Sequence, residues 1–348
     1  MRRLLFLLPL LTSCISAAPD SQGGILDYSI NIAKAVDITQ TDSTSIIKER
    51  KTIKLPRIIP GYFYIKSHGN YLFIGDHSSN SVLIIDESGA DICNLSKCGE
   101  ENGYLILSDF YVDNESHTIT VSDGFKNRIQ QYDFSGNLLS SLVFYGRLGG
   151  STFWKTTNHY YFDRSFHSGE KKKKASLLQT DLDLKATKYF LPEKRQLGIT
   201  MAHRTAFYEV NDTLVYNKKY DPIYYNLVNE SLTPRFRLNF GENAVRDDVI
   251  FQKYNHISDY ENLIEKSGCI YYCNTYETTD HILVSFCCNN KGYLSIISRH
   301  SGKVAVYLIS NNDICESIFL PKGTFGDWFV FMDPNKKNEL VLSKFAFD

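Results

Sequence analysis

A repeated pattern of hairpin residues is the feature that most constrains how this chain of 348 residues can fold. The stretches 76–89 and 123–136 begin 47 residues apart and carry Asp, Asn, Asp and Gly at the same four positions. Weaker copies place further turns near residues 181, 226 and 299, and a last strand follows at 340–345. A period in the forties is typical of repeat architectures, and six such units account for the chain from about residue 25 onward.

Each unit is predicted to consist of strands. Segments such as Tyr71–Ile74, Ser81–Ile85 and Thr118–Val121 are short, rich in β-branched or aromatic residues, and separated by Asp, Asn, Ser and Gly. The 23 Tyr and 22 Phe of the chain suit pleated strands as well. A repeat of this length made of hairpins indicates a four-stranded propeller blade, so we predict an all-β, six-bladed β-propeller over residues 25–348.

The repeated polar residues have two possible roles. Asp76, Asn80, Asp123 and Asn127 could cap the backbone of hairpin turns, or they could bind calcium or a substrate. Side chains of Asp and Asn hydrogen-bond readily to the backbone of their own turn, and the residues recur wherever a hairpin needs them. The pattern therefore favours a structural role in the turns.

Two segments depart from the repeat. Between the turns near 226 and 299 the chain has room for more than one blade, and apolar residues there follow helical spacing with Gly268 as a C-cap. We predict a helical insertion at about 243–268 in the fifth blade, serving to cover the core or to act as a lid or docking element. The other departure is the lysine run 171–174 in a hairpin loop, which is either simply solvated or in contact with lipid phosphates.

The ends of the propeller are expected to meet. A terminal blade that lacked one strand would expose an unpaired edge, so Thr52–Pro56 is predicted to pair with the last blade alongside Leu340–Phe345.

The first residues are typical of an export signal. Arg2 and Arg3 precede the apolar run Leu4–Leu11, which is too short to span a bilayer, and Leu-Thr-Ser-Cys follows at 11–14. We predict a lipoprotein signal peptide at 1–13, and a lipidated Cys14 followed by a flexible tether to residue 24. The alternative is an ordinary secretory signal. Ile15 rather than Asp follows the Cys, which by resemblance to lipoprotein sorting rules favours delivery to the outer membrane over retention in the inner membrane.

Cysteines and histidines define no site by themselves. Seven cysteines remain besides Cys14: Cys93, Cys98, Cys269, Cys273, Cys287, Cys288 and Cys315. Cys93 could form a disulfide with Cys98, and Cys269 or Cys273 could form one with Cys287 or Cys288. A zinc site with His281 is disfavoured because adjacent Cys287 and Cys288 would point to opposite faces of a strand. No motif for a nucleophilic serine, a zinc protease or a phosphate loop occurs, and a net charge of -1 argues against nucleic acid. We expect no metal and no cofactor.

Taken together, Cys14, the strand at 51–55, the two Asp-x3-Asn units and the helical insertion after Gly241 resemble six-bladed β-propeller lipoproteins of Bacteroides-type bacteria, relatives of NHL and TolB-like propellers. The resemblance covers roughly residues 25–348. Such proteins usually carry a Gly-x-Gly-Pro-Gly-Glu-like loop before the second blade, whereas this chain has 97–104 without the Pro. The resemblance implies an envelope protein with no agreed activity.

Two functions therefore remain open. The first is a non-catalytic binding or scaffold lipoprotein of the outer membrane, which takes a glycan, a peptide or an envelope protein at a channel mouth. The alternative is a propeller hydrolase or lyase with a metal in the central channel. Only the alternative requires acidic or His side chains from three or more blades to meet at the axis. The sequence leaves open the oligomeric state and the side of the membrane that the protein faces.

Candidate binding residues come from four segments expected to link neighbouring blades: 97–104, 145–153, 198–204 and 324–328. Each combines Gly with aromatic or basic residues, which lets backbone approach a ligand while rings stack on it. They are equally consistent with ordinary connections. If they form a site, one mouth of the channel should gather the following residues: Tyr145, Arg147, Trp154, His203, Arg204 and Trp328.

Overall fold

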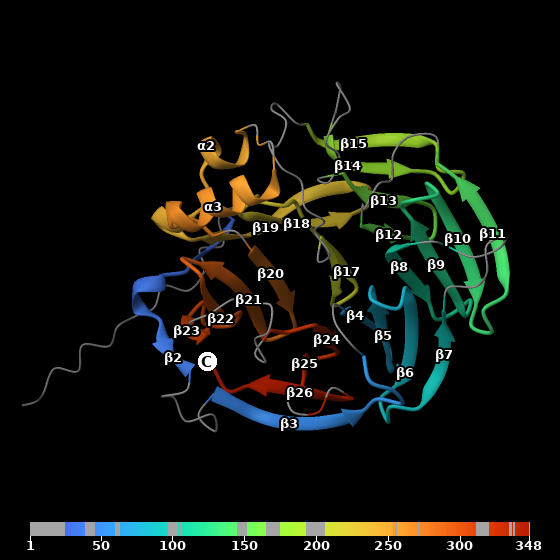
Figure 1. Ribbon diagram of the computed structural model, residues 1–348, viewed down its shortest axis with the longest axis horizontal. Helices are drawn as coiled ribbons and strands as arrows, with labels where there is room; N and C mark the ends of the chain where they lie inside the picture. The colour runs from blue at the N-terminus through green and yellow to red at the C-terminus, as the bar shows by residue number, and fades with distance from the viewer. Residues whose placement is uncertain are drawn as a thin grey trace, which may run out of the picture.

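Six antiparallel sheets surround a central axis and form a six-bladed β-propeller, which confirms the predicted fold (Figure 1). The computed structural model describes residues 25–38, 46–59, 63–96, 104, 106–144, 152–164, 175–192, 206–252, 254, 256–270, 272–310, 320–333, 336 and 338–347.

In each blade the first strand lies nearest the axis and the fourth lies at the rim (Figure 1). Blades 1 to 3 consist of β4 Phe63–His68, β5 Tyr71–Asp76, β6 Ser81–Asp86 and β7 Asp91–Leu95; β8 Leu107–Asp113, β9 Thr118–Asp123, β10 Arg128–Asp133 and β11 Leu138–Val143; and β12 Phe153–Lys155, β13 Tyr160–Asp163, β14 Ala175–Thr180 and β15 Ala186–Pro192. Blades 4 to 6 consist of β16 Phe207–Val210, β17 Thr213–Asn217, β18 Ile223–Val228 and β19 Ser231–Asn239; β20 Tyr272–Glu277, β21 His281–Cys288, β22 Lys291–Ser298 and β23 Val304–Ser310; and β24 Gly323–Phe325, β25 Trp328–Met332 and β26 Glu339–Phe345.

The N-terminal segment supplies three more strands, which we call the N-terminal belt. They are β1 Leu26–Ser29, β2 Val36–Asp37 and β3 Ile47–Lys54, with a short 3-10 helix, η1 Ile32–Lys34, between the first two. β1 adds a parallel strand outside β19, and β2 does the same outside β23. β3 pairs antiparallel with β26 and completes blade 6, with Thr52 opposite Val341. This pairing confirms the predicted ring closure, although the strand ends at Lys54, before Pro56.

The hydrophobic core is divided among the interfaces between blades. Six clusters of buried side chains each join two neighbouring sheets. On β9, for example, Ile119 and Val121 face blade 1 and pack with Phe73 and Phe110. Because the strand period is two, such alternation leaves the intervening residues of the strand for the other neighbour. Every blade therefore depends on both of its neighbours for burial.

The Asp and Asn residues of the repeat stabilise turns, as predicted. The carboxylate of Asp76 accepts from the backbone N–H of Ser78, and that of Asp123 accepts from the N–H of Phe125. Asn80 and Asn127 adopt left-handed backbone with φ of 50° and 56°. Asn80 has a second role, since its Oδ1 accepts from the N–H of Leu107, 2.9 Å away at the start of the next blade. Asn80 thus also fixes how blades 1 and 2 join.

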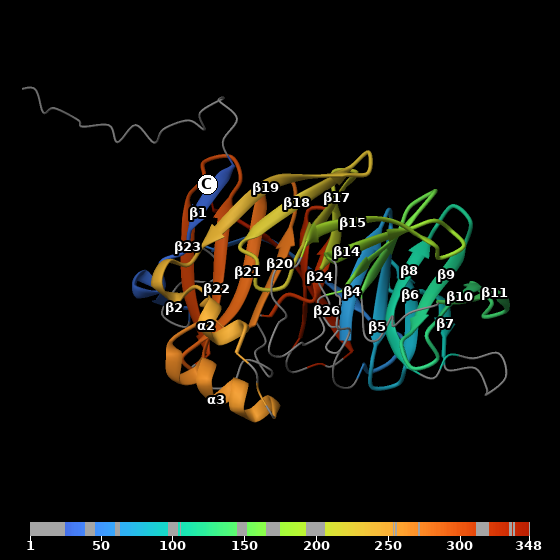
Figure 2. The same ribbon diagram turned by 90° about the horizontal axis from the view of Figure 1, so that it is seen from above.

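The helical insertion lies in the connection from blade 4 to the first strand of blade 5. It contains η3 Gly241–Asn243, α2 Asp247–Ile250 and α3 Ile257–Ser267, and the helices project from one face of the ring (Figure 2). Gly268 ends α3 with φ 71°, which confirms the predicted cap. In the part of the chain that is described, no helix combines the length and apolar character needed to cross a membrane.

The buried side chain of Tyr260 fixes α3 to blade 4. Its hydroxyl makes a hydrogen bond with that of Tyr220, in the turn between β17 and β18, and its ring packs edge-on against Tyr254. The helix therefore covers part of the blade, which agrees with the first of its two predicted roles, that of covering the core.

Candidate functional site

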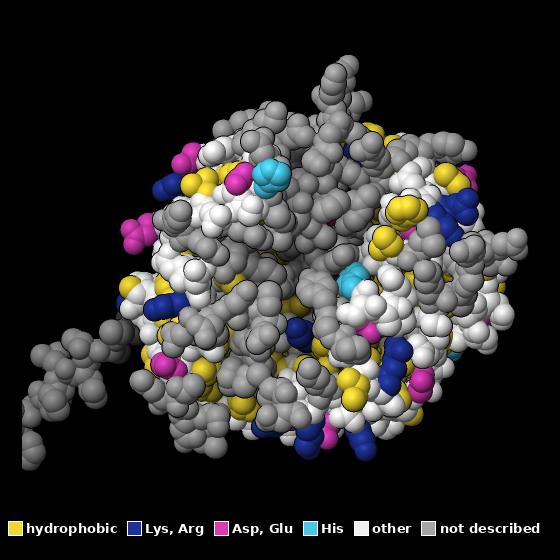
Figure 3. All heavy atoms as spheres, in the orientation of Figure 1, with side chains coloured by type: hydrophobic (Ala, Val, Ile, Leu, Met, Phe, Trp, Pro, Cys, Tyr) yellow, Lys and Arg dark blue, Asp and Glu magenta, His cyan; other side chains and the backbone are white. Residues whose placement is uncertain are grey.

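A narrow cavity runs along the axis of the propeller. Its wall is formed by residues 64–67 of β4, Trp154 of β12, residues 207–209 of β16, Thr275 and Tyr276 of β20, and residues 322–324 at β24. The space open to the centres of water molecules is about 50 Å³, which holds only a few waters. Side chains from five blades thus line a cavity into which a ligand could insert no more than a small group. Figure 3 shows the face of the propeller that carries the helices.

One wall of the cavity is held by a buried carboxylate that joins three blades. Asp109 of β8 is 1% exposed, and its Oδ1 lies 2.8 Å from the Lys66 ammonium of β4. The hydroxyl of Tyr64 donates to the same oxygen at 2.8 Å, and the backbone N–H of Phe153 on β12 donates to Oδ2 at 2.8 Å. Blades 1, 2 and 3 therefore meet at Asp109.

The Lys66 ammonium also lies among aromatic rings. It is 5.1 Å from the ring centre of Phe110, 5.7 Å from that of Tyr64 and 5.9 Å from that of Trp154. Such cation–π contacts contribute most where water is excluded, and Lys66 is only 13% exposed. Trp154 also meets Tyr111 edge-on, with 5.3 Å between ring centres. Trp154 is therefore fixed on the cavity wall.

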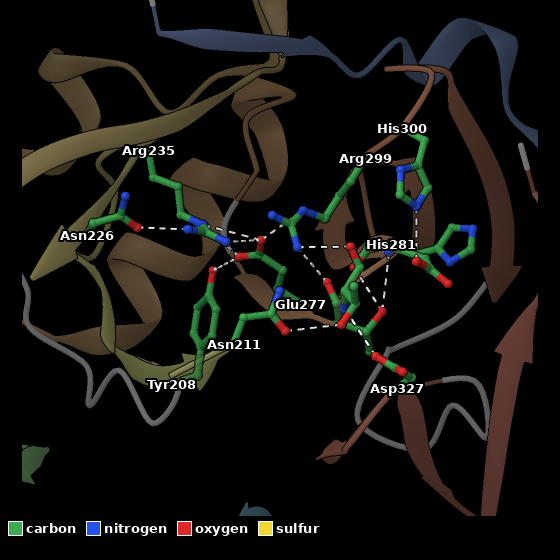
Figure 4. A network of polar contacts seen from close by, with 12 residues as sticks. Tyr208, Asn211, Asn226, Arg235, Glu277, His281, Arg299, His300 and Asp327 are labelled. Atoms are coloured by element: carbon green, nitrogen blue, oxygen red, sulfur yellow. Dashed lines mark hydrogen bonds and ion pairs between the residues drawn. The ribbon is translucent and has the colours of Figure 1, made fainter. Parts of the chain in front are cut away.

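The opposite wall is held by a second buried carboxylate, Glu277, at the end of β20 (Figure 4). Its side chain has no solvent exposure. Arg235 of β19 contacts it at 2.5 Å and Arg299 at 3.2 Å. Tyr208 of β16 donates its hydroxyl to Glu277 Oε2 at 3.2 Å, and Arg235 also donates to the side chain of Asn226 at 2.8 Å. Blades 4 and 5 are thus joined through one carboxylate.

The electrostatics of this cluster favour the charged form of Arg235 and the neutral form of Tyr208. Burial opposes the charge on Arg235, but hydrogen bonding to Glu277 and its negative charge leave the pKa of Arg235 raised overall. Burial, followed by the charge of Glu277, raises the pKa of Tyr208 well above its usual value. Tyr208 therefore stays a neutral hydrogen-bond donor where it lines the cavity.

A weaker pair crosses the mouth of the channel. His68 Nδ1 of blade 1 lies 3.8 Å from Glu209 Oε2 of blade 4, and these blades stand opposite each other in the ring. The helices come just before β20, the first strand of blade 5, so they lie at the mouth where the first strands begin. His68 and Glu209 lie near the ends of their first strands, so this pair is at the opposite mouth. Burial raises the pKa of Glu209, and the interaction with His68 opposes this rise.

The structure separates the two described residues of the predicted binding set. Trp154 lines the cavity, but Trp328 lies between the ammonium groups of Lys51 and Lys344, 4.6 Å and 4.7 Å from its ring centre. Tyr145, Arg147, His203 and Arg204 lie outside the described residues.

The expectation that residues 324–328 link two blades was wrong. Gly326 and Asp327 form the turn between β24 and β25 inside blade 6, where Phe325 pairs with Trp328. The two-residue turn has Gly326 at φ 55°, a conformation that suits a tight hairpin. A hairpin within a blade and a short connection between blades have the same Gly-rich composition, so the sequence did not distinguish them.

Sequence reasoning missed the charged residues that hold the cavity walls. Lys66 and Asp109 are 43 positions apart, and Glu277 is 42 positions from Arg235. No local motif links residues so distant. The available signal was a charged residue inside an otherwise apolar first strand, as in Phe-Tyr-Ile-Lys at 63–66.

None of the described cysteines forms a disulfide: Cys93, Cys269, Cys273, Cys287 and Cys288. Cys287 packs against Leu320, whereas the thiol of Cys288 donates to the carbonyl of Gly268 on the other face of β21. The disulfides considered among residues 269–288 are therefore not formed, and Cys98 and Cys315 lie outside the described residues. Within the described ranges, no three His, Cys, Asp or Glu side chains are placed to hold one metal ion.

Comparisons with known proteins agree with this architecture. A family model described as "6-bladed beta-propeller" matches residues 59–331. A Bacteroides fragilis protein proposed to be exported has a similar crystal structure, with a TM-score of 0.77 and 16% identity over 92% of this chain and 100% of its own. A DUF4221 protein of Bacteroides vulgatus has a TM-score of 0.59 and 11% identity over 88% of this chain and 99% of its own. No curated protein matches the sequence. At these identities the two structures show a shared fold.

Proposed function

The chain belongs to the DUF5128 family of six-bladed β-propellers, and we propose that it is a lipid-anchored envelope protein that binds a glycan at its channel without converting it. Export and anchoring rest on the signal pattern of residues 1–13 and on Cys14. The similar Bacteroides fragilis protein, itself proposed to be exported, supports the same location.

The placement of Trp154 carries the proposal for the ligand. An indole ring on a cavity wall offers a flat apolar face for a sugar ring, and Thr275 and Thr324 bring hydroxyl groups to the same cavity. Glu209 adds a carboxylate oxygen near the mouth. Because the cavity holds only a few waters, we expect a sugar ring to stack on the solvent-exposed part of Trp154 while one of its substituents enters the cavity and the rest of the glycan stays at the mouth.

The contacts of the described carboxylates near the cavity support binding without conversion. Asp109 contacts Lys66, Glu277 contacts two arginines, and Glu209 faces His68. Hydrolysis of a glycoside usually needs two carboxyl groups placed on either side of the scissile bond, one of them protonated. Here the carboxylates stabilise contacts between blades, which gives the walls the rigidity that suits recognition.

Intrinsic fluorescence can test this binding because the chain has only two tryptophans. In the Trp328→Phe variant the emission comes from Trp154, and titration with chitin-derived and mannose-derived oligosaccharides should shift it. In the Trp154→Phe variant the remaining Trp328 should not respond, and affinity should fall about tenfold or more because the stacking surface is reduced. Mass spectrometry should recover the oligosaccharide unchanged.

The matched variants separate the outcomes. A response in Trp154→Phe as large as in Trp328→Phe would place binding outside the cavity. A response to peptides but not to oligosaccharides would replace the glycan by a peptide, and cleaved oligosaccharide would favour the hydrolase alternative.

Lipidation of Cys14 is tested separately. The Cys14→Ser variant should incorporate no labelled fatty acid and should leave the membrane fraction, because the serine hydroxyl does not replace the thiol that carries the lipid. A Cys93→Ser variant is the matched control, since Cys93 lies buried in blade 1 and should not alter labelling. Equal labelling of Cys14→Ser and the parent protein would refute the anchor.

A further inference from the structure

The outer rim of the propeller has two different halves. The N-terminal belt covers blades 4, 5 and 6, where β1, β2 and β3 form the outermost strands. Blades 1, 2 and 3 end instead in β7, β11 and β15, and among the described residues no further strand pairs with them. Each of these edges presents backbone N–H and C=O groups along one side.

Charges protect these edges unequally. β3 carries five charged residues, β7 has Asp91, and β15 has Lys188 and ends at Pro192. β1 and β2 contain Asp27 and Asp37. β11 has the sequence Leu-Leu-Ser-Ser-Leu-Val, with neither a charge nor a proline. Proteins commonly use charges and Pro to keep edge strands from pairing with other chains, so β11 is the exception on this rim.

β11 is also open to solvent. Leu139 is 54% exposed and Val143 is 47% exposed, and Ser140 and Ser141 between them are exposed as well. The strand is held from inside by β10, where Gln131 lies opposite Ser140. Its outer side therefore combines a regular backbone edge with apolar side chains.

We propose that β11 is a self-association edge, at which two copies of the chain pair antiparallel about a two-fold axis and join two blades into one eight-stranded sheet. The fold already accepts strands outside its blades, since β1 lies outside β19 and β2 lies outside β23. A two-fold pairing uses both edges at once and leaves none for a third copy.

The lack of charge on β11 favours a second copy of the chain as the partner that pairs with this edge. When a strand pairs antiparallel with its own copy, a charged residue near the two-fold axis meets a like charge, which is unfavourable. Five of the six rim strands carry such residues, and only β11 does not. A strand of six residues provides an edge of about 20 Å. So short a contact predicts a reversible dimer that depends on protein concentration.

Sedimentation velocity from about 1 to 100 µM tests the pairing, since weak specific contacts have dissociation constants in this range. The parent protein should shift from monomer to dimer. The double variant Ser140→Lys/Ser141→Lys should stay monomeric, because it places a cation on each face of β11 whatever the register. Ser140→Glu/Ser141→Glu should also stay monomeric, and an equal mixture of the two should restore the dimer.

Asn94→Lys provides the matched control, because it adds a charge to an exposed position of β7 on the neighbouring blade and should leave dimerisation unchanged. An unchanged thermal midpoint shows that each variant is folded. A parent protein that remains monomeric throughout, one that grows beyond a dimer, or a Lys double variant that still dimerises would each overturn the proposal. A mixture that stays monomeric would overturn it too.

Discussion

A chain that lacks residues 46–58 should not fold. The deletion removes β3, which pairs with β26 along seven matched positions and completes blade 6. It also removes Ile53 and Leu55, each 3% exposed in the core between blades 6 and 1. Burial of two such side chains contributes about 3–6 kcal/mol. That amount is comparable to the whole stability of a typical domain, about 5–15 kcal/mol, before the open edge of β26 is counted.

Thermal unfolding followed by circular dichroism measures this effect. The deleted chain should show no cooperative transition. As a control, Lys48, Glu49 and Arg50, which are exposed, can be replaced by Ser in the full chain, and the transition should survive. A cooperative transition of the deleted chain near the parent midpoint would show that ring closure does not hold the propeller together.

Replacement of Glu277 by Ala should destabilise the protein by about 3–5 kcal/mol, the loss expected when one partner of a buried ion cluster is removed. The substitution leaves the guanidinium groups of Arg235 and Arg299, 15% and 26% exposed, facing each other without a counter-charge. It also removes the acceptor for the hydroxyl of Tyr208. Because both arginines are mostly buried, solvent compensates only part of this loss.

Urea unfolding tests this prediction, with the midpoint expected to fall while the dependence on urea stays the same. Asp280→Ala is the control. Asp280 contacts His300 at 3.0 Å near the same end of blade 5, but the two side chains are 55% and 70% exposed. Its loss should cost less than about 1 kcal/mol, as for other surface pairs. Equal effects of the two substitutions would contradict the role of burial at Glu277.

The fold was largely predictable because its information is local. A hairpin turn needs particular residues at fixed positions, so Asp76 and Asn80 revealed a blade, and their repetition at Asp123 and Asn127 revealed the next. Gly268 similarly marked the end of a helix. β1 and β2 escaped prediction because they have four and two residues and pair only through tertiary contacts.

The candidate site was much less predictable. Trp154 was identified as a candidate and does line the cavity, but the residues that fix it, Lys66 and Asp109, belong to two other blades. Their meeting depends on how the blades are arranged about the axis. Trp328 shows the converse. The composition of its segment, 324–328, matched that expected of a binding site, but β25 places the Trp328 ring beside Lys51 and Lys344 instead.

The N-terminal belt sets the order in which the protein can be completed. β3 is made early in synthesis, yet its partner is β26, and the paired residues Lys54 and Glu339 are 285 positions apart. Until the chain has been made through residue 345, β3 has no partner and blade 6 is incomplete. Contacts of such long sequence separation are slow to form. Ring closure should therefore be the last and slowest step, and a ribosome-bound chain truncated before residue 339 should remain sensitive to protease.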